Sequence, residues 1–237
     1  MKIRYIALFL ALVSSWLVKA QPQLNDRKSC DRVIADMEKR LNAPFSSTQQ
    51  EDSCLYILNQ LMSSNLLSKI DKLLPEYMIE TLNKNRLEST AEDIEFVTTD
   101  GLSHRLSEYK TPLKLLYFND PDCDACALVK ARLDTTSLLK QMVEQQLLTV
   151  IAVYTLDNEN AWRKTPMPAY IVNGWDQAQR IENEETFLLP TMPVFYILDS
   201  SNIVKVKNEP SLNNIASYLK ELSSHKAGQP QCRDNKK

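Results

Sequence analysis

Residues 115–130 read LLYFNDPDCDACALVK, and this stretch decides the fold. The run 114–118 is short and apolar, as in a strand buried at the centre of a sheet. The residues 119–122 break that strand, and helical periodicity extends from residue 127 to about 145. The motif Cys123-Asp124-Ala125-Cys126 therefore lies where a buried strand gives way to a helix.

Two cysteines three residues apart at a helix start suit redox chemistry. Free N–H groups and the positive end of the helix dipole stabilise a thiolate on Cys123. Cys126 lies one turn further on, close enough to attack a mixed disulfide formed by Cys123. An inert structural disulfide and a metal site are the alternatives. Zinc requires a second Cys-x-x-Cys or paired histidines, a spacing not offered by Cys30, Cys54, Cys232, His104 or His225.

Outward from this stretch the sequence predicts a mixed α/β sheet with helices against its faces. Two strand-like runs, 94–99 and 102–106, flank the hairpin turn Asp100-Gly101. Further strands are predicted at 147–154, 194–198 and 203–206, and an amphipathic helix at 213–222.

The remaining parts of the chain differ from this sheet-forming part. Residues 1–20 have a basic start, an apolar run and a small-x-small cleavage signal, as a signal peptide does. The apolar run is shorter than the ~20 residues that span a bilayer, although an uncleaved anchor is the alternative. Residues 21–93 carry helical apolar faces without a catalytic cluster, which predicts a small helical domain. A second domain is predicted at 94–225 and a flexible polar tail at 226–237.

Composition excludes several classes of function. The 237 residues carry a net charge of −2, which becomes −5 without the three basic residues of the signal peptide. This acidic balance argues against a nucleic-acid partner. Three widely separated glycines cannot build a phosphate-binding loop. Two histidines are too few for a three-histidine zinc site.

With these motifs the sequence resembles the thioredoxin-like superfamily. Thr191-Met192-Pro193 before VFYIL matches the cis-proline that opens the next central strand in that superfamily. The resemblance is closest to Bacteroides-type exported thioredoxin-like proteins with an N-terminal helical domain of unknown function. The matching segments are 85–86 (NR), 91–93 (AED), 115–130, 152–162 (AVYTLDNENAW), 173–176 (NGWD) and 190–199 (PTMPVFYILD).

The resemblance implies a thioredoxin-like fold after the helical domain, and an exported thiol–disulfide oxidoreductase of a bacterial periplasm or cell envelope. Cys123 would be the attacking thiolate and Cys126 the resolving thiol, with Pro193, Met192 and Asp122 forming the substrate-binding rim. No cofactor beyond the Cys123–Cys126 disulfide and no metal is implied.

The implied partners are protein thiols or disulfides and a membrane or periplasmic electron donor, with no stable membrane span after cleavage. A non-catalytic binding or assembly module with a structural disulfide is the alternative. The helix start stabilises a Cys123 thiolate, while Asp122 and Asp124 oppose it by a comparable amount. A weakly stabilised thiolate predicts a reductase of protein disulfides.

Several positions stay open from the sequence. Tyr117 stands near where thioredoxin buries a carboxylate as proton acceptor, so the group that deprotonates Cys126 is not identified. Cys54 is expected to be a buried small hydrophobe, and Cys30 with Cys232 is one candidate disulfide. The aromatic residues of the connection 158–186 either pack in the core or form a lip for a partner; they are Trp162, Tyr170 and Trp175.

Overall fold

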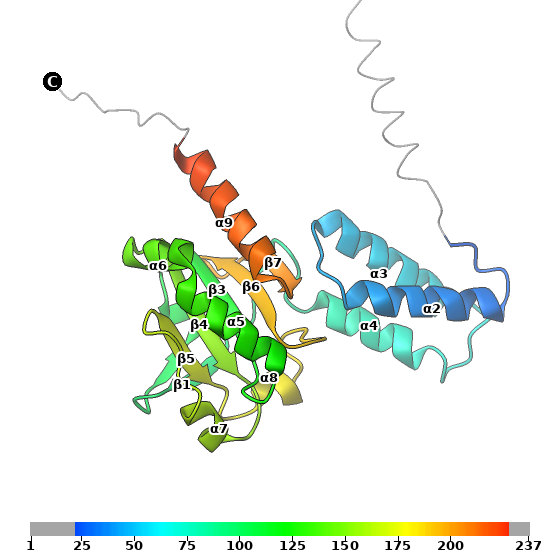
Figure 1. Cartoon of the computed structure of the whole chain (residues 1–237). Helices are drawn as coiled ribbons and strands as arrows, with labels where there is room; N and C mark the ends of the chain where they lie inside the picture. The colour runs from blue at the N-terminus through cyan, green and yellow to red at the C-terminus, as the bar shows by residue number, and fades with distance from the viewer. Residues whose placement is uncertain (1–21, 228–237) are drawn as a thin grey trace, which may run out of the picture. The chain divides into compact units, whose positions relative to one another are not determined.

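The computed structural model describes residues 22–227, which form two compact units (Figure 1). The helical unit comprises residues 22–41 and 52–80, and the sheet unit comprises 42–51 and 81–227. The predicted signal peptide, most of the predicted tail and Cys232 lie outside the described residues. Within residues 22–227, no helix combines the length and the apolar character needed to cross a bilayer.

Three helices form most of the helical unit, as the apolar periodicity predicts: α2 (Arg27–Leu41), α3 (Thr48–Ser63) and α4 (Leu73–Asn83). The Ser29 N–H donates to Asp26 Oδ1 at 2.7 Å, which satisfies a free amide at the start of α2. The ends of α3 and α4, at 48–51 and 81–83, cluster with the sheet unit. Cys30, Val33, Cys54, Leu58, Leu61 and Met78 are among the buried residues of the helical unit.

The segment between α3 and α4 is not the helix that its leucines suggest. Residues 64–72 form turns, in which Ile70 is exposed. The Ser64 hydroxyl accepts the Leu66 N–H, and the Asp71 carboxylate accepts the Ser68 N–H. Such local side-chain bonds to the backbone compete with a helical ladder.

The sheet unit contains seven strands in the order β2-β1-β5-β4-β3-β6-β7. Their bounds are β1 (Glu95–Thr98), β2 (Ser103–Arg105), β3 (Leu113–Asn119), β4 (Leu148–Tyr154), β5 (Ile171–Trp175), β6 (Val194–Asp199) and β7 (Val204–Glu209). The central strand β3 runs parallel to β4 and antiparallel to β6. The sheet is therefore mixed, as predicted.

Six helical segments accompany these strands: η1 (Leu106–Glu108), α5 (Asp124–Thr135), α6 (Ser137–Glu144), α7 (Glu159–Arg163), α8 (Arg180–Asn183) and α9 (Leu212–Ala227). Helices α5, α6 and α9 contribute Leu133, Leu139 and Ile215 to one core cluster, together with alternate residues of β3, β4 and β6. On the opposite face of β3, Phe118 packs against Phe187 and Tyr196. Both faces of β3 are thus covered, which explains its continuous apolar run.

Two elements of the sheet unit differ from the sequence prediction. Strand β5 lies inside the connection 158–186 and joins β4 to the hairpin strand β1. It was missed because it is short and contains Gly174, where a Cβ atom would come within 2.6 Å of Phe96. The helix expected over 127–145 is divided at Thr136, whose backbone is extended and whose hydroxyl donates to the Arg132 carbonyl at 2.7 Å.

A buried ion pair ties the segment 42–51 to β7. Lys207 Nζ lies 3.1 Å from Glu51 Oε1, and neither side chain is exposed to solvent. The second Glu51 oxygen accepts the Leu87 N–H at 3.0 Å. Phe45 also forms an isolated bridge with Lys207. In the structure, these contacts join residues 42–51 and 81–87 to the sheet. The predicted boundary between the domains 21–93 and 94–225 concerns independent folding and stays a prediction.

Candidate active site

Cys123 is the N-cap residue of α5 and follows the end of β3 after the short turn 120–122. Its backbone is extended, and its Sγ accepts the Cys126 N–H at 3.2 Å. The preceding turn is held by Asp120, whose carboxylate accepts the Asp122 N–H at 2.9 Å and whose carbonyl accepts the Cys123 N–H at 3.2 Å. The sulfur of Cys123 therefore faces a free amide at the positive end of the helix.

The two cysteines of the motif differ in exposure. Cys123 is half-buried, whereas Cys126 is 3% exposed. Burial raises the pKa of the Cys126 thiol well above its ordinary value, and the hydrogen bond with Cys123 adds to the rise, while a backbone hydrogen bond at Asp120 lowers it. An exposed sulfur thus precedes a shielded one, which is the arrangement needed for an attacking and a resolving thiol.

The residue predicted to be a cis-proline lies beside this pair. The Met192–Pro193 peptide bond is cis. Pro193 precedes β6, whose first residue Val194 pairs with Phe118 near the end of β3. This register brings the Met192 carbonyl to 3.6 Å from Cys123 Sγ, which donates to it. Four of the five predicted site residues are therefore close to one another.

Asp122, the fifth predicted site residue, is exposed in the turn before Cys123. Asp124 is also exposed, in the first turn of α5. Burial raises the pKa of Tyr154 at the end of β4, and Asp120, Asp122 and Asp157 raise it further. The edge of the sheet that carries Cys123 is therefore acidic.

Tyr117 does not supply the missing carboxylate but supports the helix. It is buried, stacks on Phe195 at 5.0 Å between ring centroids, and donates its hydroxyl to the Cys126 carbonyl at 3.0 Å. Burial raises the pKa of Tyr117 far above its usual range. The Tyr117 hydroxyl is consequently a fixed hydrogen-bond donor.

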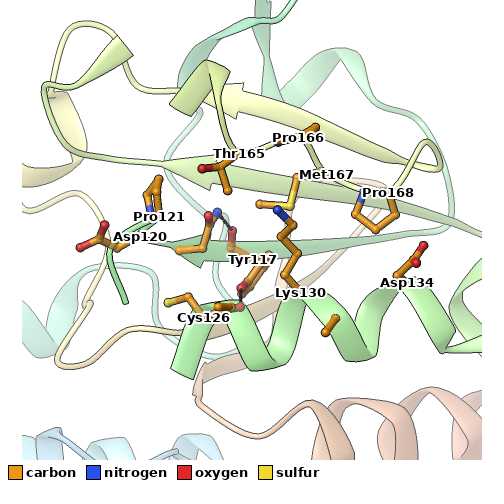
Figure 2. A pocket seen from close by; sticks show the side chains of 13 residues that line it. Tyr117, Asp120, Pro121, Cys126, Lys130, Asp134, Thr165, Pro166, Met167 and Pro168 are labelled. Carbon is orange, nitrogen blue, oxygen red and sulfur yellow. Dashed lines mark hydrogen bonds between the residues drawn. The ribbon is translucent and has the colours of Figure 1, made fainter. Parts of the chain in front are cut away.

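A pocket of about 610 Å³ lies beside Cys126 (Figure 2). One wall is formed by α5 and the end of β3, and the other by residues 165–168. Lys130 extends from α5 into this pocket. Lys130 is not predicted from the sequence, although its position four residues after Cys126 places both on one helical face.

The aromatic residues of the connection 158–186 pack in the interior. Trp162 and Trp175 are buried and lie 5.6 Å apart between ring centroids, in a cluster with Tyr154. Tyr170 is half-buried and donates its hydroxyl to the Leu133 carbonyl at 2.5 Å. The structure therefore favours packing over a lip for a partner. No group of three potential metal ligands occurs among residues 22–227.

Comparison with known proteins identifies the class to which this fold belongs. No protein-family model and no curated protein matches the chain. Among solved structures, it is similar to a thioredoxin-like protein from Bacteroides caccae, with a TM-score of 0.68 at 20% identity over 82% of this chain and 77% of that one. The chain thus has a thioredoxin-like fold.

Two Bacteroides fragilis structures match about half of the chain at higher identity. A conserved protein of unknown function has a TM-score of 0.54 at 29% identity, covering 56% of this chain and 98% of that one. The C-terminal domain of an uncharacterized protein has a TM-score of 0.55 at 25% identity, covering 57% and 98%. These similarities extend the fold assignment and name no activity.

Proposed function

We propose that this protein is an exported thiol–disulfide oxidoreductase that reduces disulfides of other proteins. The observation that carries the proposal is the asymmetric pair at the start of α5. Cys123 is accessible and accepts a helix-start amide, while Cys126 is shielded one turn away. Residues that only form a structural disulfide have no need of this asymmetry.

The proposed reaction has two steps. The Cys123 thiolate attacks one sulfur of a substrate disulfide, forming a mixed disulfide and releasing the other substrate sulfur as a thiolate that takes up a proton. Cys126 then loses its proton and attacks Cys123 Sγ, which forms the Cys123–Cys126 disulfide and releases the second substrate thiol. Two electrons pass to the substrate, and an electron donor must reduce the pair again.

The acidic surroundings support the reducing direction. Asp120, Asp122 and Asp124 flank Cys123 in sequence, and like charges oppose a thiolate that the helix start favours. A reduced form with a weakly stabilised thiolate gives up its electrons more readily. Met192, Pro193 and Asp122 form the proposed rim against which the substrate chain is held.

The proposed setting follows from the remaining predictions. The signal peptide at residues 1–20 directs the chain to the periplasm or cell envelope, where disulfides persist. The proposed partners are protein disulfides and a membrane or periplasmic electron donor. The redox chemistry requires only the Cys123–Cys126 pair, without a metal or an organic cofactor.

Turnover of a model protein disulfide tests the proposal. Wild type is compared with Cys123→Ser and with Cys54→Ala, which removes a buried cysteine of the helical unit. Loss of turnover in Cys123→Ser alone is the expected result, because serine keeps the N-cap hydrogen bond but removes the nucleophile. Equal, negligible turnover in all three proteins would favour the non-catalytic binding module instead.

A further inference from the structure

The pocket beside Cys126 has two ends that differ in their charged groups (Figure 2). Asp120 lies with Cys126 at one end, and Asp134 lies at the other. Lys130 is the one cationic residue that lines the pocket in the described part of the chain. Its side chain is directed away from Cys126, toward the segment 165–167. The end next to the redox pair therefore has a carboxylate but no cation of its own.

A buried hydrogen-bond acceptor is available in the same pocket. Asn119, the last residue of β3, lines the pocket and is 4% exposed. Its side-chain nitrogen donates to the carbonyls of Tyr117 and Val153, both at 3.3 Å. No group among residues 22–227 donates to its side-chain oxygen. A buried acceptor without a donor costs free energy, and a donor that enters the pocket would offset this cost.

Asp120 connects this acceptor with the nucleophile. It follows Asn119 directly in the chain, and its carbonyl accepts the Cys123 N–H at 3.2 Å. One oxygen of its carboxylate accepts the Asp122 N–H at 2.9 Å, which leaves the other oxygen for a ligand. A group bound between Asn119 and Asp120 is thus next to the sulfur that attacks the substrate.

Several carboxylates near this end of the pocket lack a cationic partner within residues 22–227. They are Asp120, Asp122, Asp124 and Asp157. Three of them lie around the end of β4, where Asp120, Asp122 and Asp157 raise the pKa of Tyr154. Unpaired charges of one sign create a potential that attracts the opposite charge and repels its own. The surroundings of Cys123 therefore complement a cation.

We propose that the protein acts on disulfides whose cysteine has a lysine or arginine beside it in the sequence, and that this cationic side chain binds between Asn119 and Asp120. This inference rests on the proposed function and names the class of substrate. An ammonium or guanidinium group has several N–H donors, so one side chain can serve both the Asp120 carboxylate and the Asn119 oxygen. The exposed Asp122 and Asp157 attract the same cation during the encounter.

Turnover of three matched peptide disulfides tests this preference. The peptides differ only in the residue after the oxidised cysteine, which is lysine, glutamine or glutamate. Wild type is compared with Asp120→Asn, which keeps an oxygen for the Asp122 N–H and removes the charge. The control is Glu144→Gln, at an exposed carboxylate of α6 that does not line the pocket. The readout is the ratio of kcat/KM between peptides, because a change in the Cys123 thiolate alters all three alike.

We expect wild type to prefer the lysine peptide over the glutamate peptide about 10- to 100-fold at low ionic strength. The ratio should fall in 1 M salt, where the Debye length is about 3 Å. Asp120→Asn should lower the lysine-to-glutamine ratio about 3- to 10-fold, and Glu144→Gln should leave it unchanged. Equal kcat/KM for the three peptides, or the same ratio in Asp120→Asn as in wild type, would overturn the inference.

Charged thiol reagents measure the same preference without turnover. In Cys126→Ser, Cys123 attacks a methanethiosulfonate with an aminoethyl or a sulfonatoethyl group, which forms a mixed disulfide and releases methanesulfinate. The cationic reagent should gain at least about 10-fold over the anionic one relative to free cysteine, and Asp120→Asn should remove much of this gain. A rate ratio equal to that of free cysteine would overturn the inference. Absence of turnover with every peptide would instead contradict the proposed function, so the two failures can be told apart.

Discussion

Among residues 22–227, the helical unit and the sheet unit each contain two cysteines, and the two pairs are placed quite differently. Cys30 and Cys54 are both buried in helices of the helical unit. Cys123 and Cys126 lie at a strand–helix junction, where one sulfur is half-exposed and the other is shielded. The residue type is the same, but only the second placement combines access, a helix start and a neighbouring thiol.

Charged residues show the same contrast between the units. In the helical unit, Arg27 pairs with Asp31 and Asp71 at the surface. In the sheet unit, Glu51 and Lys207 are paired without exposure to solvent. Surface pairs contribute little to stability, whereas a buried charge that loses its partner is costly. Placement, and not residue type, therefore decides what each group does.

The largest expected effect concerns trapping of substrate. Cys126→Ser should accumulate a mixed disulfide between Cys123 and a disulfide-containing protein, because the resolving thiol is absent. Cys123→Ser and Cys54→Ser should accumulate none. Non-reducing electrophoresis followed by mass spectrometry of the linked peptide measures this difference. An adduct on Cys54 or Cys30 in the folded protein would contradict the claim that only the cysteines of the sheet unit are placed to react.

Native-state alkylation gives the next largest effect. In Cys126→Ser, Cys123 should react with iodoacetamide on the order of 100-fold faster at pH 7.5 than Cys126 does in Cys123→Ser. Burial raises the pKa of Cys126, so its thiolate is scarce at neutral pH. The rate of Cys126 alkylation should therefore increase as the pH rises toward this raised pKa. Cys30 and Cys54 should react only when the chain unfolds. Equal rates at Cys123 and Cys126 would contradict the assigned roles.

The buried ion pair gives a smaller effect, on stability. Lys207→Met should lower the free energy of unfolding by about 3–5 kcal/mol, because it removes the buried ammonium and leaves the buried Glu51 carboxylate with only Arg86, at 3.6 Å, as a cationic partner. The double variant Glu51→Gln/Lys207→Met should recover most of this loss. Arg27→Met, at an exposed pair of the helical unit, serves as the control and should leave the urea midpoint nearly unchanged. An equally small change for Lys207→Met would show that this pair does not anchor the segment 42–51.

Much of the sheet unit follows from the sequence, because its central elements have strong local signals. Three of these signals can be predicted without a structure: the buried run at 114–118, the hairpin turn at Asp100-Gly101 and the Cys-x-x-Cys at a helix start. Strand β5 could not be predicted in this way, since its position depends on the close approach of Gly174 to Phe96, a contact between residues far apart in the chain. The break at Thr136 depends on a side-chain bond that competes with the helix.

The sequence also predicts part of the candidate site. The redox pair follows from spacing, and Met192 and Pro193 follow from resemblance to a fold that brings them near Cys123. Lys130 was missed because an isolated lysine on a helix resembles any solvated surface charge. Its place in a pocket depends on residues 165–168, which lie more than thirty positions away in the sequence and line the same pocket.

The reduction potential of the Cys123–Cys126 pair tests the central claim most directly. The purified protein is equilibrated with glutathione and with dithiothreitol redox buffers, and the fraction of the pair that is oxidised is measured by alkylation and mass spectrometry. A reversible two-electron transition at or below about −200 mV, in the range of protein-disulfide reductants, is the predicted result. A potential near about −120 mV, as strong oxidants have, or a pair that does not titrate at all, would contradict the account.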